Sequence, residues 1–261
     1  MRRYLKLYLS FIRICLMREM EARGSFVVGC LVIFCFPVFP LLLVGAIYSQ
    51  VPNLAGWTLY QYLMLVGTFQ IVSALTYTMF LRNIFQFPEY VRKGELDFFL
   101  LKPVNSQFML TTRYLSFSEL AQAVPGTALV IIGALNAGTA IDWWRWPLYA
   151  GFVACSVIIC YAMWFIMTIP CIWFIRLDTQ EFFFSMAELG RYHPTMFGGL
   201  VRSVLLYVIP FGIIAATPAD WLLSRITWQS AGWMLLVTAG LLFLSNRFWR
   251  FAQTRYYGAS S

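Results

Sequence analysis

The stretch Phe87–Asn105, FPEYVRKGELDFFLLKPVN, is the most heavily charged internal segment of a chain that is otherwise largely apolar. Its charged residues are Glu89, Arg92, Lys93, Glu95, Asp97 and Lys102. A proline in the first turn and a glycine just beyond the last turn are typical boundaries of a helix. Pro88 and Gly94 therefore predict a short helix over Pro88–Lys93. A helix this short is marginal alone, so we expect it to pack against another element or a partner.

The sequence on either side of this stretch is typical of a helical membrane protein. The chain has 261 residues, of which 61% are hydrophobic and 11% are charged, whereas about 25% of the residues in a soluble domain are charged. The mean hydropathy is +0.71. Several apolar runs reach the length of about 20 residues that a membrane-spanning helix needs. Because these runs are continuous and not alternating, they exclude a membrane β-barrel.

The predicted fold class is an all-α polytopic membrane protein with six transmembrane helices. The spans are expected at about 26–48, 57–80, 108–134, 147–174, 201–216 and 231–248. Residues 25–261 then form a single transmembrane domain, with a cytoplasmic coupling loop at 81–107. Residues 1–24 precede it as an amphipathic interfacial arm, because apolar and basic residues fall on neighbouring faces of a helix there, and Gly24 is a candidate stop.

The basic residues indicate the orientation. The net charge is +8, from 19 basic and 11 acidic residues, and cytoplasmic loops of membrane proteins collect Lys and Arg. Six spans with both ends inside leave 17 of the 19 basic residues on the cytoplasmic side, and only Arg145 and Arg225 outside. That count treats 176–202 as cytoplasmic. Within it, 176–200 is expected to be an amphipathic segment broken by Gly190 and Pro194. The sequence therefore predicts an N-in/C-in topology, which accounts for the positive charge without nucleic acid as a partner.

The sequence carries no motif of a catalytic or nucleotide-binding site. The P-loop pattern GxxxxGK[ST] is absent, as are GxSxG and HExxH. The six cysteines lie in apolar stretches without a CxxC pair, which is typical of buried free thiols, and the single histidine, His193, cannot hold a metal alone. We therefore predict no catalytic residue, metal or cofactor in this chain and no enzymatic activity of its own. Energy for uphill transport would have to come from another subunit.

Ionisable residues are rare inside the expected spans. Glu119 is the candidate, about 9 Å beyond Arg113 along the third span at 1.5 Å per residue. One interpretation is an inner-leaflet carboxylate that pairs with a neighbour or faces water. The other is a polar point on a substrate path.

An energy-supplying partner needs a contact on the cytoplasmic side, and the loop at 81–107 offers the best one. Charged residues there can fix the register of docking through charge pairing, and a glycine permits the turn. The residues expected to couple to an ATPase are Glu89, Tyr90, Arg92, Gly94, Glu95 and Asp97.

The run Gly94–Asn105, GELDFFLLKPVN, resembles the G-E-L-D-x-x-L-L-x-P-x-N signature of second-type ABC exporter permeases. The ending at 255–260, RYYGAS, and the stretch at 209–219 are similar to that family's tail and fifth-span region. The resemblance implies a permease subunit of an ATP-driven exporter in the bacterial inner membrane, surrounded by membrane lipids. It also implies two kinds of protein partner: separate ABC ATPase subunits, which carry ATP and Mg, and a second six-span permease, identical or homologous. The arm and the 81–107 loop would dock on the ATPase, and cargo would leave between the two permeases.

Two other functions stay open from the residues alone. The first is a membrane-embedded enzyme or accessory subunit that acts on lipid-linked or isoprenoid-linked substrates. It predicts paired acidic residues at one membrane face, whereas the acids here are scattered. The second is a structural assembly subunit. The sequence does not identify the substrate.

Overall fold

The structure is a computed structural model that describes residues 2–35, 37–51, 53–138, 141–174 and 180–256. Over these ranges the secondary structure is helical, apart from an isolated bridge between Leu54 and Trp57. Four helices are long and apolar enough to span a membrane, or five if one bent pair of helices is counted as a single span. The predicted class, an all-α protein with several membrane-spanning helices, is confirmed.

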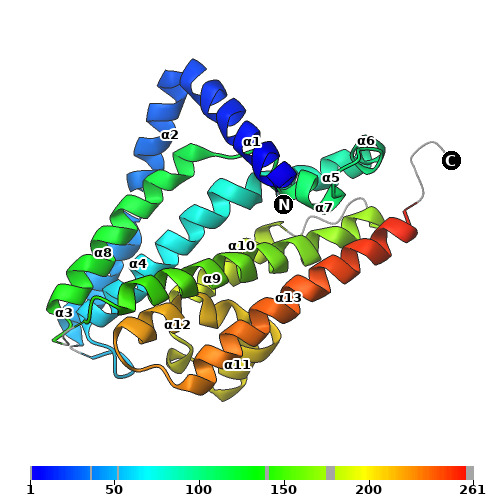
Figure 1. Cartoon of the computed structure of the whole chain (residues 1–261). Coiled ribbons are helices and arrows are strands. Elements are labelled where there is room, and N and C mark those ends of the chain that lie inside the picture. The colour runs from blue at the N-terminus through cyan, green and yellow to red at the C-terminus, as the bar shows by residue number, and fades with distance from the viewer. Residues whose placement is uncertain (1, 36, 52, 139–140, 175–179, 257–261) are drawn as a thin grey trace.

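The helices follow one another through the bundle shown in Figure 1. The first half of the chain forms α1 (Arg2–Glu21), α2 (Arg23–Cys35), α3 (Val38–Gln50), α4 (Leu59–Thr76), α5 (Arg82–Arg92), α6 (Leu96–Leu100), α7 (Ser106–Thr112) and α8 (Ala123–Asn136). The second half forms α9 (Arg145–Thr168), α10 (Gln180–Glu188), α11 (Gly199–Ser203), α12 (Ile213–Leu222) and α13 (Trp228–Thr254). A π-helical turn, Tyr77–Leu81, joins α4 to α5 in one helix of 34 residues.

The N-terminal arm is a helix, as expected, but its boundary differs. Helix α1 ends at Glu21, and Gly24 lies inside α2 rather than ending the arm. The first expected span, 26–48, is divided into α2 and α3, and Pro37 occupies the N-cap position of α3. Proline removes a backbone hydrogen bond and breaks a helix at this point. Each half has 13 residues, about 20 Å, and is too short to cross a core of about 30 Å alone.

The third expected span, 108–134, is also interrupted. Helix α7 ends at Thr112, and the spanning helix starts only at Phe117 with a 3₁₀ turn that continues into α8. The buried side chain of Asn83 holds the interruption in place, because its Nδ2 donates to the carbonyl oxygen of Tyr114 at 2.6 Å and its Oδ1 accepts from Tyr114 N at 2.8 Å. These bonds satisfy backbone groups that the broken helix leaves free.

Helices α4 and α8 pack closely through small residues. A β-carbon on Gly67 would lie 2.5 Å from the carbonyl oxygen of Gly126, and one on Gly126 would lie 2.9 Å from that of Gly67. Small residues at such crossings allow membrane helices to approach closely. Gly240 in α13 differs, because no atom of the described residues would lie within 4 Å of a β-carbon added there.

This contrast predicts that Gly67→Val strongly destabilises the fold, while Gly240→Val does not. Valine at Gly67 must push two backbones apart, which costs at least about 1 to 3 kcal/mol as overpacking. Size-exclusion chromatography of the detergent-purified protein after a temperature ramp measures the effect. A melting temperature for Gly67→Val equal to that of the unchanged protein would contradict this packing.

The expected fifth span, 201–216, is not a single straight helix. The segments Gly199–Val208 and Pro210–Leu222 are bent by 87° relative to each other. The bend falls at Ile209, which has φ −121° and ψ 84° and precedes Pro210. A residue before proline is displaced from the helical region, so the helix ends there.

The contacts around this bent pair place it at one end of the bundle, which we call the Trp57 end. The ring of His193 lies 4.5 Å from the ring of Trp57, and its Nε2 lies 3.1 Å from Asp220 Oδ2. At the far side of α12, Trp221 Nε1 donates to the carbonyl oxygen of Arg145 at 2.9 Å. His193, which precedes the bent pair, therefore lies near the start of α4, and Trp221, near the end of the pair, lies at the start of α9.

The opposite end of the bundle carries α5, α6 and the end of α13, and we call it the α6 end (Figure 1). Trp173 packs there against Phe248 and Phe251. Trp173 therefore lies at the α6 end and His193 at the Trp57 end, although the sequence predicts that 176–200 stays in the cytoplasm. Arg191 and Arg202, which the count of basic residues assigns to the cytoplasmic side, lie toward the Trp57 end.

Candidate functional site

Helix α5 leads to the charged stretch, but it does not begin at Pro88. The helix is continuous from Leu59 to Arg92, with Pro88 inside it. The prediction of a separate helix over Pro88–Lys93 is therefore wrong. Proline is tolerated inside a helix as a kink. One continuous helix therefore connects the Trp57 end of the bundle to the charged turn, so a displacement of the turn can be transmitted along it.

Gly94 ends α5, as the sequence predicts. Its φ is +71°, a left-handed conformation that glycine adopts without steric cost. Gly94 N donates to the carbonyl oxygen of Val91 at 3.2 Å, and Glu95 N donates to that of Tyr90 at 2.9 Å. These two bonds form a Schellman motif, which closes the helix end and fixes the direction in which α6 leaves.

Helix α6 is anchored on its inner face. Leu96 and Phe99 are buried, and the Tyr90 ring lies 5.0 Å from the Phe99 ring. Asn105 then caps α7, because its Oδ1 accepts from Phe108 N at 3.1 Å. The tightly packed inner face gives α6 a fixed position at the end of the bundle (Figure 1).

The last helix, α13, and the residues after it also contact α6 and the start of α7. Trp249 Nε1 and Gln253 Nε2 in α13 both donate to Ser106 Oγ, at 3.1 and 2.6 Å. Tyr256 lies beside Asp97, and the pKa of Tyr256 is raised by burial and further by this carboxylate. A displacement of α6 would therefore be transmitted both to α5 and to α13.

The outer face of α6 presents two large apolar side chains. Phe98 is 68% exposed and Leu101 is 82% exposed. Residues three apart in a helix lie on the same face, so the pair forms one projecting apolar surface. The sequence prediction concentrated on charges and did not include either residue. The sequence pattern that could have identified them is the helical spacing. Leu96 and Phe99 are three residues apart on the buried face, and Phe98 and Leu101 are three residues apart on the exposed face.

The six residues predicted to couple are distributed over the turn in three ways. Glu89 and Arg92 are exposed on α5, and Glu89 Oε1 lies 2.8 Å from Lys93 Nζ, an ion pair whose hydrogen bond raises the pKa of Lys93. Gly94 and Glu95 form the turn itself. Tyr90 and Asp97 face the protein, against Phe99 and Tyr256. The structure thus brings all six to one tip and directs two of them inward.

Glu119 lies at the start of the third spanning helix. It is half-buried and close enough to Glu19 of α1 for the two carboxylates to repel each other. Glu19 Oε1 accepts a hydrogen bond from Phe117 N at 2.9 Å, so α1 contacts the first residue of that helix. Glu119 therefore lies beside the arm and next to a second carboxylate, not a basic partner, and both interpretations of this residue stay predictions.

A pair of charges inside the bundle was not predicted. Glu188 and Arg191 form an ion pair, and the Arg191 guanidinium lies 5.6 Å from the centre of the Phe69 ring. Phe69 is ten residues beyond Leu59, about 15 Å along a helix of 34 residues. The side chain of Arg191 is 22% exposed and that of Glu188 is 44% exposed, so the guanidinium is the more enclosed member of the pair. The sequence prediction placed 176–200 in the cytoplasm and so overlooked the pair.

The comparison with protein families gives one match. The model of a family described as "ABC-2 family transporter protein" matches residues 34–260, which is most of the chain from the end of α2 onward. No curated protein and no solved structure matches.

Proposed function

The chain belongs to the ABC-2 transporter family and is a permease component of an ABC transporter, and we propose that it is the permease of an exporter driven by ATP hydrolysis on separate subunits. Within the complex, this chain forms the substrate path together with a second permease. Its location is the bacterial inner membrane. The observation that carries the coupling part of this proposal is the anchored tip of α5 and α6 with its exposed apolar pair.

The tip has the properties of a surface on which a motor subunit pushes. Its backbone is fixed by the turn at Gly94, by burial of Phe99 and by the contacts of α13 with Ser106. A force applied to α6 therefore passes into one 34-residue helix that reaches the opposite end of the bundle. Exposed apolar side chains rimmed by charges are typical of the centre of a protein interface.

The proposed topology has six crossings with both termini inside. Five of the proposed crossings are α2 with α3, α4 with α5, 117–136, α9 and α13. The other is proposed between Trp173 and His193, because these two residues lie at opposite ends of the bundle. The bent pair of helices then lies at the outer face. This arrangement keeps the N-terminal arm, the charged turn and the tail on the same side, where most of the basic residues lie.

Charge reversal at the turn tests the proposed docking. In cells that co-express the partner ATPase, the double variant Glu95→Lys, Asp97→Lys is expected to recover several-fold less ATPase with the tagged permease, because charge pairing sets the docking geometry. Asp142→Lys is the matched control, since Asp142 is a partly exposed acid near Arg145, at the other end of the bundle. Equal recovery with both variants, together with unchanged ATP-dependent export, would refute docking at the turn.

A further inference from the structure

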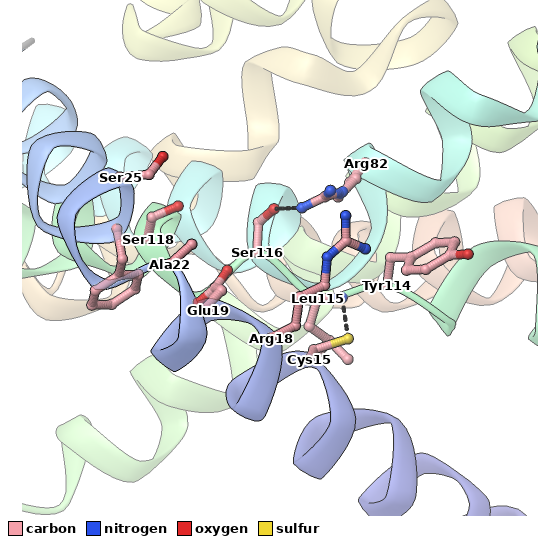
Figure 2. Close-up of a pocket in the computed structure, with 11 residues that line it drawn as sticks. Cys15, Arg18, Glu19, Ala22, Ser25, Arg82, Tyr114, Leu115, Ser116 and Ser118 are labelled. Atoms are coloured by element: carbon pink, nitrogen blue, oxygen red, sulfur yellow. Dashed lines mark hydrogen bonds between the residues drawn. The ribbon is translucent and has the colours of Figure 1, made fainter.

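A polar cleft lies where the elbow of α1 and α2 meets the interruption before the third spanning helix. Figure 2 shows its lining, to which α1 contributes Arg18 and Glu19, α5 contributes Arg82, the interruption contributes Ser116, and the 3₁₀ turn that follows it contributes Ser118. Its volume is about 290 Å³, enough for a phosphate-sized group with several waters. The walls therefore come from three parts of the chain that are distant in sequence.

Two guanidinium groups are directed into this cleft (Figure 2). Arg82 Nη1 donates to Ser116 Oγ at 3.4 Å. Among the residues that the structure describes, no carboxylate lies within 4.0 Å of Arg18 or Arg82. The one carboxylate in the lining, Glu19, accepts a hydrogen bond from Phe117 N through Oε1, whereas its Oε2 is buried and has no hydrogen-bond partner among the described residues. Two guanidinium groups against one carboxylate leave the lining with a net positive charge, which favours an anion.

The surroundings of the cleft are apolar and open to the outside. On α2, Val27, Val28 and Leu31 are each more than half exposed, and on α1 the same is true of Met17 and Met20. In a membrane protein such side chains face acyl chains. A group that binds in the cleft would therefore have room for a hydrocarbon tail along the elbow.

We propose that this cleft binds the anionic phosphate headgroup of a lipid, with its acyl chain along the exposed face of α2. The guanidinium groups of Arg18 and Arg82 provide charge-assisted hydrogen bonds to phosphate oxygens, and Ser116 and Ser118 add hydroxyl donors. Basic clefts between membrane helices are suited to anionic headgroups. The site involves none of the six predicted coupling residues and neither Phe98 nor Leu101, so its test is separate from the tests of docking at the α5–α6 tip.

The test uses the full chain in a neutral detergent, with three additives at matched concentrations: phosphatidylglycerol, phosphatidylcholine and inorganic phosphate. A ligand that binds the folded state raises its melting temperature. We expect phosphatidylglycerol to raise it and the other two to have little effect. Arg18→Gln is expected to weaken the apparent affinity for phosphatidylglycerol about tenfold, the loss of one charge-assisted hydrogen bond.

Arg13→Gln is the matched control, because Arg13 is an exposed arginine of α1 outside the cleft. Arg18 is also exposed, so its substitution leaves the fold intact and the test does not depend on a change at the more buried Arg82. Equal lipid affinity of Arg18→Gln and Arg13→Gln would overturn the site. An equal shift with inorganic phosphate would show a free-anion site and reject a lipid as the ligand.

Discussion

The double substitution Phe98→Ser, Leu101→Ser is expected to abolish stable association with the ATPase while the permease still folds and inserts. Both side chains are mostly exposed, at 68% and 82%, so serine removes few contacts within the chain. Burial of a large apolar side chain in an interface contributes about 1.5 to 3 kcal/mol. Loss of both therefore costs about 3 kcal/mol or more, at least about a hundredfold in affinity.

Titration of the purified ATPase against the permease in detergent measures this affinity, and substrate-stimulated ATP hydrolysis provides a second readout. The control is Leu135→Ser, since Leu135 is 79% exposed near the C-terminal end of α8, away from α6. This variant should bind the ATPase normally. If the double variant bound as tightly as the control, the apolar face of α6 would have no part in docking.

Comparison of the apolar and charged variants assigns their separate contributions. Charges at the rim of an interface act mainly on the rate of association and are screened by salt. The defect of Glu95→Lys, Asp97→Lys should therefore change strongly between low and high salt, whereas the defect of Phe98→Ser, Leu101→Ser should persist. The centre of the docking surface would then be α6, with the turn at Gly94 as its support.

Local rules predicted the features of the charged stretch that depend on neighbouring residues. Gly94 has the positive φ expected of a helix stop, and the GELD run begins at a real change of direction. Pro88 was interpreted wrongly because the same residue starts a helix in one context and kinks it in another. The distinction depends on whether the preceding helix continues, which a window of a few residues does not contain.

The interruption at 113–116 and the fifth crossing depend on tertiary contacts. Asn83 supports the interruption from 31 residues away through two hydrogen bonds to Tyr114. In the proposed fifth crossing, Glu188 and Arg191 lower the hydropathy, although their pairing offsets their charges. The bent pair that follows is more apolar, and the structure buries its Phe211, Ile214 and Ala215. Hydropathy alone therefore predicts 201–216 as the span.

The two charges of that crossing give the second prediction. Glu188→Gln leaves the more enclosed Arg191 unpaired and is expected to lower the free energy of unfolding by about 1 to 3 kcal/mol, the usual cost of an unsatisfied polar group. Arg191→Gln is expected to cost less, because the Glu188 side chain is 44% exposed and can be hydrated. The double variant Glu188→Gln, Arg191→Gln should regain most of that loss, because no unpaired charge remains.

A double-mutant cycle on thermal or denaturant unfolding in detergent measures the coupling between the two residues. The Glu89–Lys93 pair provides the matched control, since it is also an ion pair within one helical turn but its side chains are 48% and 52% exposed. Its coupling should be about 0.3 to 0.5 kcal/mol, typical of exposed helical pairs. Glu188 is 44% exposed, close to the control, but Arg191 is 22% exposed and lies over an aromatic ring, so the enclosed guanidinium should make this pair couple more strongly. Similar coupling in both pairs would mean that Glu188 and Arg191 are hydrated like a surface pair, and the crossing through α10 would have to be abandoned.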